Sequence, residues 1–105
     1  MIATINYIQE RLNEIAILCK LHQVSSIALF GSAANETMNE HSDIDLLVEF
    51  SEDLDVLEYA DNYFSLLEKL EALLGKPVDL VSRKSLTNPI LMQEINRSKV
   101  ALYAA

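Results

Sequence analysis

Two short stretches decide the fold of this chain: LFGS at residues 29–32 and DIDLLV at residues 43–48, with ten residues between Ser32 and Asp43. Successive side chains of a β-strand point to opposite faces, so Asp43 and Asp45 share one face of an otherwise apolar strand. Two like charges beside a buried sheet repel one another and resist desolvation. Mg²⁺ relieves such repulsion, and it usually binds one or two carboxylates together with substrate phosphates. The pair therefore predicts a magnesium site on this strand.

The Gly31-Ser32 pair suits a phosphate ligand. It interrupts the apolar strand just upstream of the two aspartates. A turn at that place offers backbone N–H groups and a hydroxyl to a phosphate.

The hydrophobic pattern predicts strands separated by helices. Strands are expected at residues 26–30, 43–50, 76–81 and 100–103, and helices at 4–23, 55–74 and from 89 onward. Helix signals are a capping box from Asp55, a stop at Gly75 and an Asn88 cap before Pro89. We therefore expect one domain over residues 1–105, of α/β or α+β class, with a small mixed sheet and helices packed on it.

The same pattern predicts which side chains form the core. On residues 43–50, Ile44, Leu46, Val48 and Phe50 form a purely apolar face, opposite Asp43, Asp45, Leu47 and Glu49. The helix at 4–23 is expected to bury Ile5, Ile8, Leu12, Ile15 and Leu18, and the helix at 55–74 to bury Leu57, Ala60, Phe64, Leu67, Leu70 and Leu74. The last helix has Ile90, Leu91 and Ile95 on its apolar side.

Gly-Ser, a spacer and Asp-x-Asp, followed by Asp79 within VDLV at residues 78–81, resemble the signature of the polymerase-β-like nucleotidyltransferases. Within that superfamily the chain resembles the minimal nucleotidyltransferases, the MNT antitoxins that pair with HEPN-domain toxins. The resemblance covers roughly residues 25 to 103.

The resemblance implies a role for each motif residue. Asp43 and Asp45 would bridge two Mg²⁺ ions, and Asp79 would hold the ion nearest the attacking hydroxyl and accept its proton. Gly31 would let the backbone approach the triphosphate of ATP, and Ser32 would bind a phosphate oxygen. The catalytic and metal-binding residues are thus Asp43, Asp45 and Asp79, and the nucleotide-binding residues are Gly31 and Ser32.

One segment departs from the family pattern. Minimal nucleotidyltransferases usually continue Gly-Ser with a basic residue, Ala, Arg and Gly, whereas this chain has Ala33, Ala34, Asn35 and Glu36. Charge-assisted bonds to phosphate are worth roughly 1.5–3 kcal/mol each, so the departure predicts weaker ATP binding.

The resemblance implies an antitoxin that transfers AMP from Mg-ATP to a hydroxyl of a HEPN ribonuclease toxin in a hetero-oligomeric complex, and a tyrosine is the expected acceptor. Two alternatives stay open. One is an antitoxin that neutralises the toxin by binding alone. The other is a transferase for small molecules of the aminoglycoside kind.

Charge and hydropathy limit the partners. The net charge is −8, with eight scattered Lys and Arg residues. This argues against direct nucleic-acid binding, which normally needs a basic patch. No apolar run approaches the length of a membrane span, and a cytoplasmic protein is expected.

A few single residues have more than one interpretation. Cys19 is expected to be a small core residue, His22 to end a helix and His41 to lie in a loop. Arg83 and Lys84 are expected to be turn residues, with triphosphate contact as the alternative. A docking surface near Leu91, Ile95 and Tyr103 is expected only if these side chains do not close the core.

Overall fold

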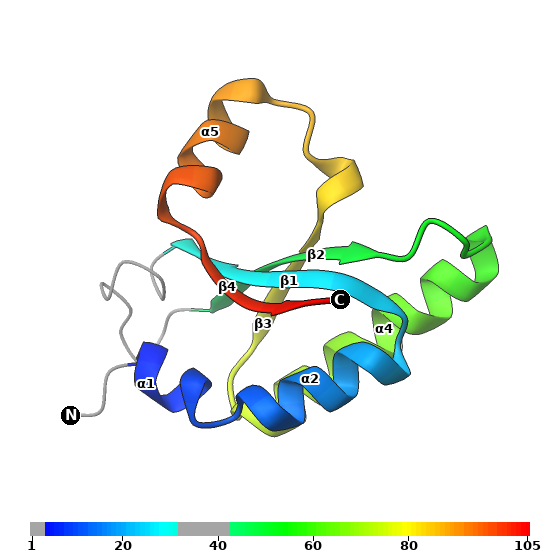
Figure 1. The fold of residues 1–105 in the computed structure, drawn as a ribbon, viewed down its shortest axis with the longest axis horizontal. Helices are drawn as coiled ribbons and strands as arrows, with labels where there is room; N and C mark the ends of the chain where they lie inside the picture. Colours follow the sequence, from blue (N-terminus) through cyan, green and yellow to red (C-terminus); the bar gives the residue numbers. More distant parts are fainter. Residues whose placement is uncertain (1–3, 32–42) are drawn as a thin grey trace.

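The computed structural model describes residues 4–31 and 43–105 (Figure 1). The elements follow one another as α1 (Thr4–Gln9), α2 (Leu12–Leu21), β1 (Val24–Phe30), β2 (Ile44–Phe50), α4 (Val56–Leu74), β3 (Val78–Ser82), the 3-10 turn η1 (Arg83–Ser85), α5 (Pro89–Ser98) and β4 (Val100–Ala104). All four predicted strands are present, each within two residues of its expected limits.

The strands form one mixed sheet in the order β3-β2-β1-β4. β1 pairs antiparallel with both β2 and β4, whereas β2 pairs parallel with β3. The parallel pair needs a long crossover, and α4 supplies it between β2 and β3. The predicted mixed sheet is confirmed.

Helices α2 and α4 cover one face of this sheet, while η1 and α5 stand on its other side (Figure 1). The covered face of β2 is the one that alternation predicted: Ile44, Leu46 and Val48 are fully buried, and Phe50 is 4% exposed. The core beneath it takes Ile8, Ile15 and Cys19 from the first two helices. Burial raises the pKa of the Cys19 thiol to about 12, so this residue behaves as the small core side chain that was expected.

The expected helix at 4–23 is wrong in one respect, because it breaks between Gln9 and Leu12. Arg11 has φ −111° and ψ 17°, outside the helical range. Its backbone N–H bonds to the Ile8 carbonyl, and its guanidinium donates instead to the Tyr7 carbonyl at 2.9 Å. The side chain thus satisfies the acceptor that a continuous helix would have paired with the Arg11 N–H.

The predicted ends of α4 are confirmed, and so are Leu70 and Leu74 on its buried face, but that face is wrong at two other positions. The capping box joins Asp55 and Glu58, and Gly75 has φ 70° at the C-cap. Leu57 and Phe64, however, are 77% and 65% exposed. The inward face consists of Leu66, Leu70 and Leu74, with Tyr59 and Tyr63 partly buried beside them. Both tyrosine hydroxyls bond to β3, and these bonds favour the rotation of the helix that is observed.

The cap of α5 is also as expected, since the Asn88 side chain accepts from the N–H groups of Ile90 and Leu91. Ile95 is buried, but Ile90 and Leu91 are 71% and 45% exposed, so the predicted apolar side only partly meets the core. Tyr103 packs against the core, which leaves the expected docking surface without one of its three members.

His22 closes α2, as expected, and it is buried. Its Nδ1 lies 2.7 Å from the Leu18 carbonyl, and its Nε2 lies 2.9 Å from the Ser65 hydroxyl on α4. A carbonyl only accepts, so Nδ1 carries the hydrogen and the imidazole ties the two covering helices together. Among the residues that the structure describes, no helix has the length and apolar character needed to cross a membrane.

Candidate active site

The sheet register brings the predicted carboxylates together. Asp45 on β2 is the direct partner of Asp79 on β3. Asp43 lies two residues before Asp45, immediately ahead of β2. Partners on adjacent strands share a face, so these carboxylates gather at one end of the sheet face that α2 and α4 leave open.

The electrostatics of Asp45 reflect this gathering. Its pKa is raised above the ordinary value, first by burial and then by the negative charges of Asp79 and Asp43. Asp43 and Asp79 themselves are exposed. A half-buried carboxylate with two like charges beside it favours either a proton or a cation.

Four hydrogen bonds hold β3 so that Asp79 faces Asp45. The Val78 N–H donates to the Glu71 carboxylate at 2.9 Å, and Tyr63 donates its hydroxyl hydrogen to the Leu80 carbonyl at 2.5 Å. The Tyr59 hydroxyl bonds to Ser82. The Ile44 N–H donates to the Pro77 carbonyl at 3.0 Å, which fixes the start of β2 against the start of β3.

Glu71 and Tyr63 are therefore positioning residues that sequence reasoning missed. Both lie on α4, and each bonds to a neighbour of Asp79 rather than to Asp79 itself. The pKa of Tyr63 is raised by burial first and then by the negative charge of Asp79. The helical spacing of residues 63 and 71 marks them only as one face of a helix, so the sequence carries no signal for this role.

Gly31 ends β1 next to the same carboxylates. It has φ 70°, which favours glycine, and Phe30 before it is the strand partner of Asp45. A Cβ on Gly31 would overlap Asp45 Oδ2 and lie 3.1 Å from Asp45 Cγ. Glycine is thus needed here for its backbone conformation and for the space that Asp45 occupies.

The matching family model is described as a nucleotidyltransferase domain, and it aligns with residues 14–102. This chain belongs to that family. The nucleotidyltransferase is 42% identical over 84 residues to MJ1379 of Methanocaldococcus jannaschii, whose name is that of a candidate protein adenylyltransferase; the match covers 80% of this chain and 82% of that protein. It is 43% identical over 67 residues to the protein adenylyltransferase MntA of Thermococcus cleftensis, over 64% of each chain.

Solved structures show the same fold. A chain described as a candidate minimal nucleotidyltransferase has a TM-score of 0.72 at 35% identity, over 89% of this chain and 90% of that one. A toxin-antitoxin crystal structure with AMP-PNP matches with a TM-score of 0.68 at 29% identity, over 90% of this chain and 73% of that one. A tri-AMPylated HEPN toxin of Shewanella oneidensis in complex with an MNT antitoxin matches with a TM-score of 0.61 at 27% identity, over 92% and 72%. The polymerase-β-like, minimal nucleotidyltransferase core expected from the motifs is confirmed.

The carboxylates of this nucleotidyltransferase suit Mg²⁺ as a donor set. Carboxylate oxygens are the ligands that Mg²⁺ prefers. The pKa of Asp45 is raised by burial first and then by the charges of Asp79 and Asp43, and a cation beside it would favour the ionised form. In the part of the chain that the structure describes, Asp79 forms no ion pair with Arg83 or Lys84. These neighbours therefore do not neutralise its negative charge.

The carboxylates do not form a closed cage. Within the described residues, no three His, Cys, Asp or Glu side chains form a group that could hold a metal ion on their own. Mg²⁺ seldom uses an all-protein cage, because it keeps waters and substrate phosphates among its ligands. Ser32, the departing residues Ala33 to Glu36, and His41 lie outside the described residues.

Proposed function

We propose that this nucleotidyltransferase is an antitoxin that transfers AMP from Mg-ATP to a tyrosine hydroxyl of a HEPN toxin. The observation that carries the proposal is the pairing of Asp45 with Asp79, with Asp43 beside them, on the open sheet face. Relatives named protein adenylyltransferase and a neighbouring complex with an AMPylated HEPN toxin support the choice of reaction and acceptor.

In this reaction the acceptor oxygen forms a bond to the α-phosphorus of ATP, and the bond from that phosphorus to the pyrophosphate oxygen breaks. Asp43, Asp45 and Asp79 would hold Mg²⁺, which supplies charge neutralisation on the phosphates. Asp79 is exposed on an edge strand, where it can accept the proton of the attacking hydroxyl. Gly31 lets the backbone at the end of β1 come close to the phosphates.

A protein acceptor fits the open face. Asp43 and Asp79 are exposed, and the covering helices α2 and α4 lie on the opposite side of the sheet (Figure 1). An acceptor that brings its own surface would exclude water from the carboxylates and complete the pocket.

The test is the intact mass of the HEPN-like protein encoded beside this one, co-purified with wild type and with the double variant Asp43→Asn/Asp45→Asn. We expect AMP-sized additions only with wild type, because the neutral asparagine side chains lack the negative charges proposed to hold Mg²⁺. An unmodified partner bound to wild type would contradict the proposal.

The residues Ala33, Asn35 and Glu36 favour a second candidate, an antitoxin that acts by binding alone. The two candidates differ in what Asp45→Asn does in cells that express the toxin. Under the binding-only alternative, the variant protects cells as wild type does. Under AMP transfer, protection fails although the complex still forms.

A further inference from the structure

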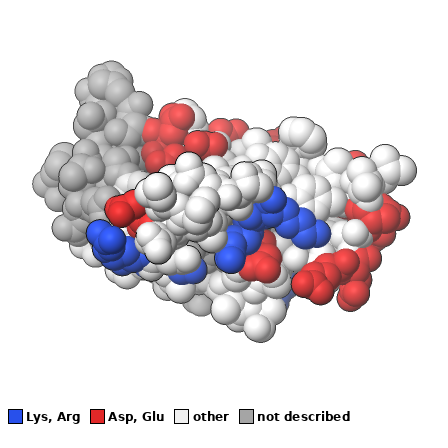
Figure 2. All heavy atoms as spheres, turned by 90° about the horizontal axis from the view of Figure 1, so that it is seen from above, with Lys and Arg blue, Asp and Glu red and all other residues white. Residues whose placement is uncertain are grey.

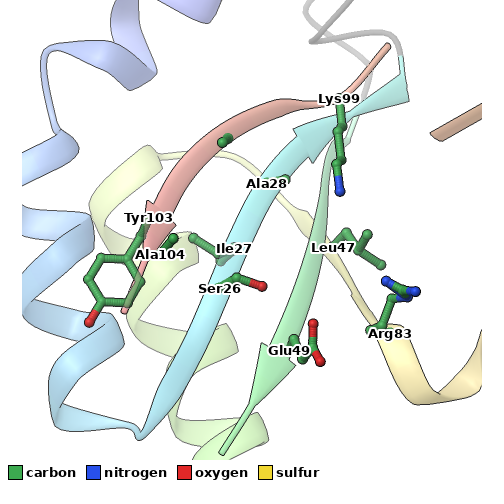
Figure 3. Close-up of a pocket in the computed structure, with 10 residues that line it drawn as sticks. Ser26, Ile27, Ala28, Leu47, Glu49, Arg83, Lys99, Tyr103 and Ala104 are labelled. Carbon is green, nitrogen blue, oxygen red and sulfur yellow. The ribbon is translucent and has the colours of Figure 1, made fainter. Parts of the chain in front are cut away.

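A hollow of about 220 Å³ lies on the open face of the sheet, beyond the carboxylates (Figure 3). Its floor is made of Ala28 and Leu47, and two basic residues, Arg83 and Lys99, stand at its rim. Figure 3 shows both basic side chains reaching over Leu47, Arg83 from η1 and Lys99 from the segment before β4. They are separated in sequence, and the fold brings them to one place.

The hollow adjoins the proposed active site. Leu47 lies two residues beyond Asp45 on the same face of β2, which places it about 7 Å farther along the strand. Lys99 precedes Val100, whose strand partner is Leu29, and the next residue, Phe30, is the partner of Asp45. Lys99 therefore lies at the carboxylate end of the sheet, and its side chain reaches from there over the hollow.

The charges around the hollow are unusual for this chain. The segment from residue 80 to the end contains four of the eight Lys and Arg residues but one of the sixteen Asp and Glu residues. Figure 2 shows Lys and Arg atoms in separate groups across this side of the molecule, with some Asp and Glu atoms next to them and more toward its edges. Neither Arg83 nor Lys99 forms an ion pair with a carboxylate of the described residues, although Glu49 also lines the hollow.

We propose that this hollow is a phosphate-binding subsite in which Arg83 and Lys99 hold an anionic group of a nucleotide whose α-phosphate lies at Asp43, Asp45 and Asp79. The inference rests on the proposed function. It supplies the cations that the segment after Gly31 lacks, because Ala33 and Asn35 stand where basic residues are usual in the family.

The size of the hollow favours part of a nucleotide over a whole one. Sites for entire drug-sized ligands measure about 300–1,000 Å³, and this hollow is smaller. A guanidinium and an ammonium suit phosphate oxygens, because both donate charge-assisted hydrogen bonds. The phosphate has two sources: the β- and γ-phosphates of ATP, or the AMP already attached to the acceptor.

The experiment is calorimetric titration of the free protein with inorganic pyrophosphate and with ATP, and of its complex formation with AMP-modified partner protein, with unmodified partner as the reference. For the ligand that occupies the hollow, we expect Arg83→Gln and Lys99→Gln each to raise the dissociation constant about tenfold. The double variant should raise this constant more. Glu49→Gln should lower it, because it removes a negative charge from the same hollow. Lys20→Gln and Lys69→Gln, exposed lysines on α2 and α4, are the matched controls for net charge.

The ligands distinguish the two sources. Weaker binding of pyrophosphate and ATP assigns the subsite to the leaving group, whereas weaker binding of the AMP-modified partner alone assigns it to the transferred AMP. Dissociation constants for all three ligands that match those of the Lys20→Gln and Lys69→Gln controls would overturn the proposal. So would equal loss of affinity for modified and unmodified partner, which would indicate a protein contact.

A failure of the subsite and a failure of the proposed function can be told apart. If the hollow variants bind phosphate as the controls do while wild type still adds AMP, only the subsite is wrong. If Arg83 and Lys99 bind pyrophosphate but no AMP is added to the partner, only the proposed reaction is wrong.

Discussion

The two faces of β2 are built from alternate residues of the same seven-residue strand, yet they do opposite things. Ile44, Leu46 and Val48 are fully buried under helices, and such burial stabilises the fold. Asp45 points to the other face, where burial first, and then the charges of Asp79 and Asp43, raise its pKa. The comparison teaches that one face stabilises this domain, while the other carries the residues proposed for its chemistry. Substitutions of neighbouring residues should therefore separate the two.

Asp45→Asn should have the largest effect on activity. The amide keeps the shape of the side chain but removes the charge proposed to hold Mg²⁺, so AMP transfer should fall by roughly a thousandfold. Without Mg²⁺ the free energy of unfolding at neutral pH should stay the same or rise, because a repulsive charge is gone. Transfer rates from intact mass and denaturant unfolding check the two parts. A destabilised variant would break the separation of the two faces.

Leu46→Ala, one residue away, should do the reverse. Leu46 is fully buried in the core, so truncation should lower the free energy of unfolding by about 2–5 kcal/mol through lost burial and a cavity. At temperatures where the variant remains folded, its transfer rate should stay near that of wild type. Urea unfolding followed by circular dichroism measures the loss. A loss below about 1 kcal/mol would show that the covered face is not what stabilises the sheet.

Gly31→Ala should affect both properties, and Gly75→Ala is its matched control. Both glycines have φ 70°, so alanine at either position should cost about 1 kcal/mol of stability. At Gly75 the nearest atom to a new Cβ is the Tyr7 hydroxyl oxygen at 4.0 Å, but at Gly31 the Cβ would overlap the Asp45 carboxylate. We expect Gly31→Ala alone to lower AMP transfer, by at least tenfold. Equal AMP transfer by Gly31→Ala and Gly75→Ala would mean that the Asp45 carboxylate does not lie against Gly31.

The smallest expected effect is a pH dependence of stability. The pKa of Asp45 is raised in the folded state above its ordinary value of 3.8, so the folded protein binds this proton more tightly than the unfolded chain. The contribution of Asp45 to stability is therefore fully present below pH 3.8 and is lost as the pH rises through the higher, folded-state pKa.

Melting temperatures of metal-free wild type and Asp45→Asn, measured from pH 4 to 8, test this sign. The melting temperature of wild type should fall relative to that of the variant as the pH rises through the pKa of Asp45. Added Mg²⁺ should raise the melting temperature of wild type and recover part of this loss, and it should leave the variant unchanged. A parallel pH profile for the two proteins would mean that the pKa of Asp45 is not raised in the folded protein.

Sequence reasoning predicted the four strands, the mixed sheet and the carboxylates, because strand alternation and the spacing of Asp43, Asp45 and Asp79 are local or motif-level signals. It predicted Leu70 and Leu74 in the core of α4 correctly but wrongly added Leu57 and Phe64, because Tyr59 and Tyr63 at helical spacing take the inward positions instead. Tertiary hydrogen bonds to β3 decide which of these side chains face inward. The approach of Arg83 to Lys99 across the sheet depends on how η1 and α5 return to β4, which no local pattern encodes.

The most direct test of AMP transfer uses ATP labelled at either the α- or the γ-phosphate, incubated with Mg²⁺, this protein and its HEPN-like partner. The account predicts that the α-label passes to the partner, that the γ-label does not, and that Asp45→Asn slows the transfer by roughly a thousandfold while the complex persists. An intact complex in which neither label reaches the partner would contradict the account and favour neutralisation by binding alone.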